Sequence, residues 1–188
     1  SIALLDVLPN GEFPILETRR LQLRQLVASD AEALFAISSD ERVLRFIAKA
    51  APKSVDEIRT KIDLIAANFH SGDGIMWAAM DRSSQRFVGT AGIWRLEREH
   101  FRGEIGYQIA PEFWGQGLIP EALAAIVQWG FQRLELHSLE AKIHPDNRAS
   151  ERVLQKLGFV KEAHLRQNYY NRVASRFEDT VVYSLIER

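Results

Sequence analysis

The order of strand, loop, helix and strand between residues 104 and 143 limits most strongly what this chain can fold into. A strand at 104–109 is followed by a loop with glycines at 115 and 117, a helical run that ends near Leu134, and a strand at 139–143. Two strands joined through one helix run parallel in a sheet, with a right-handed crossover. We therefore predict one parallel βαβ unit at the centre of the sheet.

The other segments predict a mostly antiparallel sheet with flanking helices. Strand-like runs occur at 19–26, 75–80 and 87–96, and two long strands flank Asn171-Arg172. The polar turn at 81–85 indicates a hairpin. Helices are predicted in three places: from the capping-box pattern Ser29-x-x-Glu32 to about Ser38, from Ser54-x-x-Glu57 to near Ser71, and from Asn147 to Leu157. The fold class is a mixed α/β sheet in the order β-α-α-β-β-β-α-β-α-β-β.

Composition narrows the function without naming it. We see no repeat or linker in the 188 residues, so we expect one domain over residues 1–188. The 24 Lys and Arg nearly cancel the 25 Asp and Glu, which predicts no general attraction to nucleic acid or to an anionic membrane. Absence of cysteine excludes disulfides, thiolate metal sites and cysteine nucleophiles.

The distribution of apolar residues bears on the location of the protein, and the spacing of the histidines bears on metal binding. No run of 18 apolar residues occurs, and the first sixteen residues lack a basic start and carry Asp6 and Pro9, so neither a membrane span nor a secretory signal is expected. We expect a cytoplasmic protein. The five histidines form no HExxH or other ligand spacing, so we predict no metal site.

The loop Gly115-Gln116-Gly117 precedes a helix whose first turn contains Pro120. Glycine lets a backbone approach a ligand closely, and the N–H groups at a helix N-terminus favour an anion such as a pyrophosphate. The alternative is a simple turn between strand and helix. A dinucleotide fingerprint would need a third glycine where Pro120 stands, and a Walker loop would need Gly-Lys-Ser/Thr. The sequence therefore favours neither NAD nor ATP.

Two motifs resemble a known family. They are the run from Glu104 to Gly117, EIGYQIAPEFWGQG, followed by Glu121-Ala122, and Asn147-Arg148-Ala149-Ser150 with Leu157-Gly158-Phe159. Together they resemble the GNAT superfamily of acetyl-CoA-dependent N-acetyltransferases, and more narrowly its RimJ/RimL-type branch, which acetylates ribosomal-protein N-termini. The resemblance covers about residues 15–188 and implies a GNAT-like sheet and acetyl-CoA as the co-substrate.

The same resemblance implies which residues bind acetyl-CoA. The pyrophosphate would lie on the loop, and the pantetheine chain would contact Asn147 and pair like an added strand with the backbone of Tyr107, Gln108 and Ile109. For Asn147 an Asx turn is the alternative role. Trp114 and Ile119 depart from the usual superfamily loop, although the branch often shares the tryptophan. The loop residues are Trp114, Gly115, Gln116, Gly117, Leu118 and Ile119.

Acetyl transfer to an amine needs a base for the amine and an acid for the departing thiolate. The resemblance implies Glu104 as the base, often through water, with Glu112 and Glu121 as rivals. Many members use a tyrosine acid where this chain has Leu154, and the branch instead has a serine one turn earlier, which implies Ser150. Capping of the helix is the alternative role for Ser150.

The acceptor remains open at this level. The leading hypothesis is a protein N-terminal α-amine, such as that of a ribosomal protein, and the alternatives are a small amine (polyamine, aminoglycoside or amino acid) and an inactive CoA-binding module. We expect a monomer or a homodimer. Five aromatic residues either line an acceptor pocket or pack the core: Trp77, Trp94, Phe113, Tyr169 and Tyr170. The charged cluster around Arg176 and Glu178-Asp179 is interpreted as a solvated turn.

Overall fold

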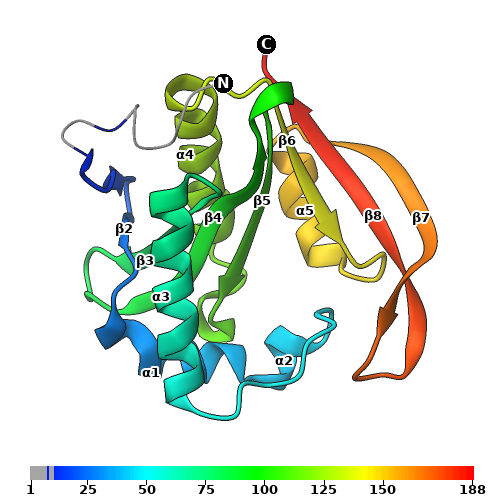
Figure 1. Cartoon of the computed structure of the whole chain (residues 1–188), viewed down its shortest axis with the longest axis horizontal. Helices are drawn as coiled ribbons and strands as arrows, with labels where there is room; N and C mark the ends of the chain where they lie inside the picture. Colours follow the sequence, from blue (N-terminus) through cyan, green and yellow to red (C-terminus); the bar gives the residue numbers. More distant parts are fainter. Residues whose placement is uncertain (1–7, 9–10) are drawn as a thin grey trace.

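The computed structural model describes Leu8 and residues 11–188. Within this part of the chain, eight strands form one twisted sheet (Figure 1). Its spatial order is β1-β2-β3-β4-β5-β6-β8-β7. The strands are β1 Leu16–Glu17, β2 Leu21–Gln25, β3 Ile75–Asp81, β4 Phe87–Glu97, β5 Arg102–Ile109, β6 Ser138–Ile143, β7 Val160–Asn171 and β8 Arg176–Ile186. The helices are α1 Ala31–Ser38, α2 Glu41–Leu44, α3 Val55–Ser71, α4 Leu118–Arg133 and α5 Arg148–Lys156.

Strands β5 and β6 form the one parallel pair among these neighbours, and the remaining pairs are antiparallel. This confirms the predicted mixed sheet with a parallel βαβ unit at its centre. The pairing joins only Arg102–Glu104 to Ser138–Glu140. Beyond these residues β5 continues along β4 to Ile109 and β6 continues along β8 to Ile143. The two strands therefore diverge and open a wedge in the sheet (Figure 1).

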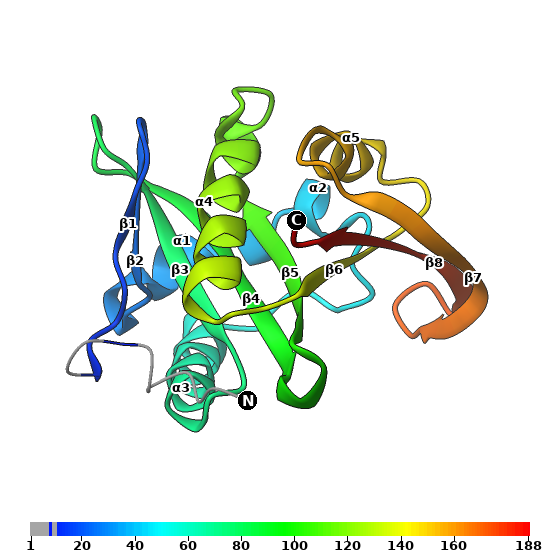
Figure 2. The same ribbon diagram turned by 90° about the horizontal axis from the view of Figure 1, so that it is seen from above.

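Helices cover both faces of the sheet. Helices α4 and α5 lie on one face and α1 and α3 on the other (Figure 2). Helix α4 comes close to β4 because Gly130 has no side chain: a Cβ there would stand 2.9 Å from Ile93 Cδ1. Trp77 of β3 packs edge-on against Trp129 of α4, with ring centroids 5.2 Å apart. The core thus fixes α4 beneath the strands that border the wedge.

One local prediction needs correction, two short elements were missed, and one prediction is confirmed. Helix α1 starts at Ala31 and not at Ser29, because the Asp30 carboxylate accepts a hydrogen bond from the Val27 N–H (2.9 Å) and pairs with Arg24 (2.8 Å), which holds residues 28–30 in a 3-10 turn. The short elements β1 and α2 were not predicted. Ser54 does cap α3, since its hydroxyl accepts from the Glu57 N–H at 3.2 Å.

The described helices contain none that is both long and apolar enough to cross a membrane. The first ten residues, on which the prediction about a secretory signal mainly rests, lie outside the described residues apart from Leu8.

Glu178 joins the β7–β8 hairpin to the end of β6, so the interpretation of its cluster as a solvated turn is wrong for Glu178, although residues 172–177 are exposed. Its carboxylate is only 8% exposed and accepts hydrogen bonds from Asn171 Nδ2 (2.6 Å), Arg176 and Tyr169. His144, just beyond β6, lies 3.3 Å away. The bonds from Asn171, Arg176, His144 and Tyr169 lower the pKa of Glu178 from 4.5 to about 2.

We predict that Glu178→Gln destabilises the protein at neutral pH by roughly 1–3 kcal/mol, the range for a lost hydrogen-bonded charge. A carboxylate whose pKa is lowered by folding contributes stability that is fully present above its unfolded pKa and lost as the pH falls through the folded value. The free energy of unfolding of the parent should therefore approach that of the variant between about pH 4.5 and pH 2. Chemical denaturation across this range measures it.

The control is Glu162→Gln, which changes an exposed carboxylate on the neighbouring strand. It should stay within about 0.5 kcal/mol of the parent at each pH. A gap between the parent and Glu178→Gln that is constant from pH 7 to pH 2 would contradict the assignment of the carboxylate.

Candidate active site

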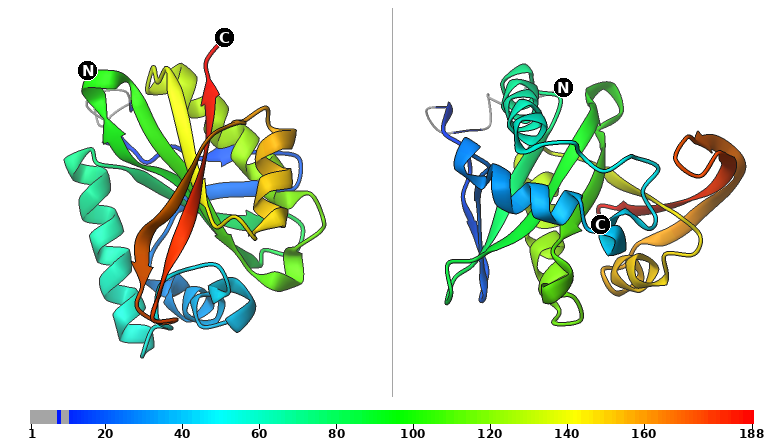
Figure 3. Two further views of the ribbon diagram at one scale, coloured as in Figure 1. Left: turned by 90° about the vertical axis from the view of Figure 1, so that its right-hand side faces the viewer. Right: turned by 90° about the horizontal axis from the view of Figure 1, so that it is seen from below.

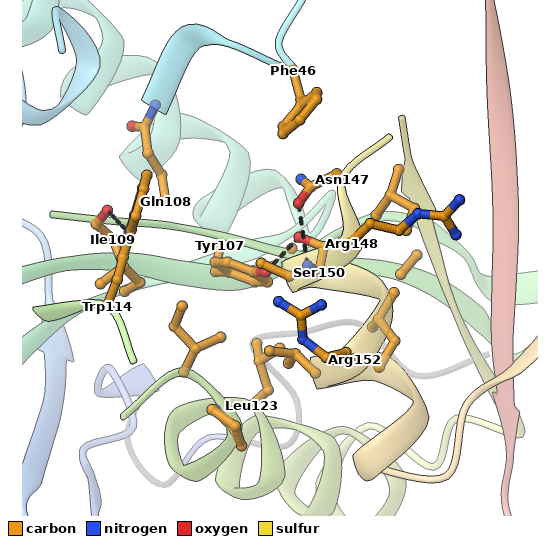
Figure 4. Close-up of a pocket in the computed structure, with 18 of the residues that line it drawn as sticks. Phe46, Tyr107, Gln108, Ile109, Trp114, Leu123, Asn147, Arg148, Ser150 and Arg152 are labelled. Carbon is orange, nitrogen blue, oxygen red and sulfur yellow. Dashed lines mark hydrogen bonds between the residues drawn. The ribbon is translucent and has the colours of Figure 1, made fainter. Parts of the chain in front are cut away.

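A cleft of about 830 Å³ fills the wedge between β5 and β6. Its walls are the second half of β5, the loop before α4, the end of β6 and the first turns of α5 (Figure 4). Phe46, which follows α2, closes one side and lies 5.4 Å from the ring of His144. The short helix α2 thus stands at the open end of the wedge, between β5 and the β7–β8 hairpin (Figure 3).

The loop before α4 has the backbone form that the sequence suggested. Gly115 and Gly117 have φ angles of 73° and 79°, a left-handed conformation that favours glycine, and Gly117 is the N-cap residue of α4. Gly117 carries no side chain to cap the helix, so the first N–H groups of α4 are available to an anion. Leu118 and Ile119 line the cleft and also pack on the core.

Arg20 and Glu121 hold this loop from behind. The Arg20 guanidinium donates to the Gln116 carbonyl (2.8 Å) and to Glu121 Oε1 (2.8 Å). Glu121 also accepts from the Thr18 hydroxyl (2.5 Å) and the Arg20 main-chain N–H (2.9 Å). Although burial opposes it, these donors lower the pKa of Glu121. Its oxygens are occupied by structural partners, and this places Glu121 in the scaffold of the loop.

The free edge of β5 presents main-chain groups to the cleft. Ala110 N–H bonds the Val88 carbonyl of β4 (2.9 Å), and in an antiparallel ladder the residues that face the partner strand alternate with those that face away. Tyr107 and Ile109 therefore direct their main-chain groups to the cleft, and Gln108 directs its own to β4. The Ile109 carbonyl accepts from the Trp114 indole N–H (2.9 Å), so Trp114 fastens the loop to the strand.

Gln108 contributes its side chain instead. Its Oε1 accepts from the Ser38 hydroxyl of α1 (3.1 Å), and the side chain borders the cleft on the face of α1 and Phe46 (Figure 4). The cleft therefore reaches from the α4 and α5 face of the sheet to the α1 face.

Asn147 and Ser150 begin helix α5, and their roles differ from the alternatives considered for them. Asn147 is the N-cap residue, because its side-chain oxygen accepts from the Ser150 N–H (3.2 Å). The interpretation of Ser150 as the helix cap is therefore wrong. The Ser150 hydroxyl points instead into the cleft and lies 2.5 Å from the Tyr107 hydroxyl (Figure 4). Leu154, one turn further along, is buried and lines the cleft without a polar group.

Glu104 lies on β5 but not among the described residues that line the cleft. Its side chain shares a face of the sheet with Gly106 and Gln108, opposite to Tyr107, since alternate strand residues face opposite sides. The carboxylate is 12% exposed and bonds the Arg95 guanidinium at 3.2 Å. Glu140 of β6 stands beside it in the parallel register. Glu112, the other rival, is an exposed partner of Arg86.

Sequence reasoning missed that the cleft is cationic. Of the described residues that line it, one is a carboxylate, Asp146, and six are cations: Arg42, Arg45, Lys142, Arg148, Arg152 and Lys156. Two of these cations have carboxylate partners outside the lining: Arg42 pairs with Asp40 at 2.7 Å and Arg148 with Glu151 at 3.3 Å. A signal was present, because residues 148, 152 and 156 recur at four-residue intervals and so share one helix face.

The aromatic candidates separate into packing and cleft residues. Trp77 is fully buried and donates its indole N–H to the Pro14 carbonyl (2.9 Å). Trp94 packs over Gly106, where a Cβ would stand 2.5 Å from its ring. Phe113 lines the cleft, whereas Tyr170 is exposed and stacks on Phe177. Across the described residues, His, Asp and Glu do not gather in a group of three that could hold a metal ion.

Comparison with known proteins identifies the class that this fold and cleft define. The sequence model described as "Acetyltransferase (GNAT) domain" matches residues 20–160. This is well over half of the chain, so the chain belongs to the GNAT family, and it is an N-acetyltransferase.

Particular relatives refine the placement. An uncharacterized N-acetyltransferase of Bacillus subtilis, YoaA, is 40% identical over 175 residues, covering 93% of this chain and 98% of the relative. The putative ribosomal N-acetyltransferase YdaF of the same organism is 30% identical over 172 residues, covering 89% and 92%. Together with the ribosomal protein uS5-alanine N-acetyltransferase of Escherichia coli, which is 28% identical over 119 residues, it supports placement in the RimJ/RimL-type branch.

Solved structures extend the likeness to the fold. The spermidine N-acetyltransferase from Vibrio cholerae in complex with CoA and spermine matches with a TM-score of 0.78 at 20% identity, covering 90% of this chain and 96% of that one. This structure and that of a RimL ribosomal L7/L12 α-N-protein acetyltransferase, with a TM-score of 0.80 at 21% identity, both contain CoA.

We predict that Glu121→Gln weakens CoA binding about 3–10-fold, because it loosens the Arg20 clamp on the loop by roughly one charge-assisted hydrogen bond. The turnover number at saturating acetyl-CoA should change less than about twofold, since Glu121 is not the base. Calorimetric titration with CoA and steady-state rates measure the two effects. Glu112→Gln is the matched control and should leave both unchanged. A large loss of turnover number with intact CoA affinity would return Glu121 to the list of candidate bases.

Proposed function

We propose that this chain transfers the acetyl group of acetyl-CoA to the α-amine at a protein N-terminus, by direct attack of the amine on the thioester. One observation carries the proposal: the glycine loop and the Ser150 hydroxyl stand in one cleft that passes between the diverging strands from face to face of the sheet. A donor held on one face can thus meet an acceptor that enters from the other.

Acetyl-CoA would lie on the α4 and α5 face. Its pyrophosphate would accept hydrogen bonds from the loop at 114–119, and its pantetheine would pair with the main chain of Tyr107 and Ile109 and contact Asn147. The CoA phosphates are polyanionic, and the cations of α5 border this part of the cleft. The lining of the cleft therefore suits the cofactor in charge as well as in shape.

Two side chains would handle the protons. Ser150 would donate to the departing CoA thiolate, because its hydroxyl faces the cleft while Leu154 offers no donor. Glu104 would take the amine proton through water from the α1 face of the sheet, which it shares with the cleft residues Gly106 and Gln108. A protein α-amine with a pKa near 7.8 costs only about 1 kcal/mol to deprotonate at pH 7, so a weak base suffices.

The charge of the cleft favours this acceptor over a polyamine. A polyamine carries several positive charges and would meet the cations Arg45 and Lys142 in the lining of the cleft. The relatives include ribosomal-protein acetyltransferases, while the spermidine enzyme resembles the chain in fold at 20% identity. A cytoplasmic location accords with the absence of cysteine.

The test is acetyl-CoA consumption with a panel of N-terminal peptides, polyamines, aminoglycosides and amino acids. The proposal expects kcat/KM for at least one peptide to exceed that for spermidine by about tenfold or more, a difference of about 1.4 kcal/mol in transition-state binding. Faster acetylation of a small amine would replace the acceptor. Binding of CoA without turnover on any acceptor would indicate an inactive module.

We further predict that Glu104→Gln lowers kcat about 10²–10⁴-fold at pH 7, with a smaller loss near pH 9.5, where the α-amine is already neutral. Rates with the best peptide from pH 6.5 to 9.5 measure this. Glu140→Gln, the same change at the neighbouring register position, is the control and should retain most of the rate. A loss that stays constant with pH would assign Glu104 to positioning, and a pH-dependent loss in Glu140→Gln would move the base to β6.

A further inference from the structure

The Tyr107 side chain joins β5 to the first turn of α5 across the cleft. Its hydroxyl oxygen lies 2.5 Å from Ser150 Oγ, and the two side chains point toward each other in the middle of the site (Figure 4). Both residues line the cleft. The family resemblance gave Tyr107 only a main-chain role, so nothing in the sequence assigned a function to its phenol.

We propose that Tyr107 is a positioning residue that acts through Ser150: its phenol donates to the serine oxygen, turns the serine O–H toward the thioester sulfur, and replaces the serine proton as it leaves. This rests on the proposed function, in which Ser150 protonates the CoA thiolate. The donor direction follows from chemistry, because a phenol is the more acidic hydroxyl and the alcohol oxygen is the better acceptor.

Helix geometry leaves the serine hydroxyl available for this role. The Ser150 N–H is already satisfied by Asn147, so the side chain is not needed at the helix N-terminus. A serine χ1 angle has three staggered minima of similar energy, and a short bond to a tyrosine on a rigid sheet strand selects one of them. The next turn of α5 places Leu154 at the same face, where it cannot substitute as a donor.

Serine alone is a poor proton source, since its alkoxide is far less stable than a thiolate of pKa near 8.5. With Tyr107 the step balances. The C–S bond breaks, sulfur keeps the electron pair and takes the Ser150 proton, and Ser150 takes the Tyr107 proton in the same movement. Water then reprotonates Tyr107, while the amine proton leaves through the base to solvent. The net change is amine plus thioester to amide plus thiol.

Burial suits the phenol to this task. It raises the pKa of Tyr107, an effect that the bond to Ser150 partly offsets. The side chain therefore begins each turnover protonated across the range in which an α-amine can be acetylated.

The competing explanation is that the bond merely anchors α5 to the sheet. Tyr183 of β8 provides the control, because it also donates its hydroxyl to α5, at Glu151 Oε2 (2.8 Å), yet it is buried and does not line the cleft. Tyr107→Phe and Tyr183→Phe each remove one phenol hydroxyl that bonds the first turn of α5. Only the first removes a hydroxyl that reaches Ser150.

The experiment measures kcat and KM for acetyl-CoA in Tyr107→Phe, Ser150→Ala, the double variant and Tyr183→Phe, with the best peptide and with water as acceptor. We expect Tyr107→Phe to lower kcat about 5–20-fold with KM within about twofold, and Ser150→Ala to lower kcat about 10–10²-fold. The double variant should be within about twofold of Ser150→Ala, because both changes remove one relay. Tyr183→Phe should keep its kcat within about twofold.

The dependence of kcat on the deuterium fraction in mixtures of H₂O and D₂O is a readout that a purely structural role of the Tyr107 hydroxyl would not change. The parent should show a curved dependence of kcat on the deuterium fraction, from two protons in motion, and Tyr107→Phe a linear one. The measurement on the parent protein is informative even if a variant fails to fold.

Each contrary result has a distinct meaning. Losses that multiply in the double variant, a Tyr107→Phe effect no larger than that of Tyr183→Phe, or a linear dependence in the parent would each overturn the relay. An unchanged kcat in Ser150→Ala would overturn both the relay and the serine acid while acetyl transfer stands. A parent that neither transfers nor hydrolyses the acetyl group would overturn the proposed function itself.

Discussion

The early end of the parallel pairing between β5 and β6 is the constraint on which the site depends. Only residues 102–104 and 138–140 pair, and beyond them the outward main-chain groups of Tyr107 and Ile109 lose a neighbouring strand. Unsatisfied main-chain groups away from water are costly, so this edge needs partners. The Trp114 indole supplies one at the Ile109 carbonyl. The remaining groups form an edge that an extended ligand can complete, and a break in the sheet thereby becomes a binding surface.

Separate interactions keep each side of this break in place. On one side α4 packs closely on β4 through Gly130, and Arg20 with Glu121 fixes the loop at its N-terminus. On the other side β6 is held by β8, and the buried Glu178 joins the hairpin to His144. The two halves are therefore held separately, and the Tyr107 to Ser150 bond bridges them inside the cleft. Holding both sides in place favours a fixed geometry for transfer.

The sequence predicted what depends on neighbours in the chain and missed what depends on distant partners. The parallel unit, the glycine loop and the cap at Ser54 each follow from local patterns, and the structure contains all three. Glu121 was a candidate base because its pairing with Arg20, 101 residues away, cannot be read from the sequence. Glu178 looked solvated because a pattern of charges cannot reveal burial, and the bond from Ser150 to Tyr107 spans 43 residues. Long-range contacts decide roles that residue type leaves open.

The distribution of charge over the fold, like the long-range contacts, was not predicted from the sequence. A formal net charge of −1 predicts no attraction to a polyanion, yet the cleft gathers six cations against one carboxylate. The balancing acids lie elsewhere, in surface pairs such as Arg86 with Glu112 and in scaffold contacts such as Arg20 with Glu121. Because the Debye length is about 8 Å at physiological salt, a ligand in the cleft responds to its walls and not to the whole protein. A nearly neutral chain can therefore present a positive local potential, which in the proposed function suits the CoA polyanion and disfavours a polycationic acceptor.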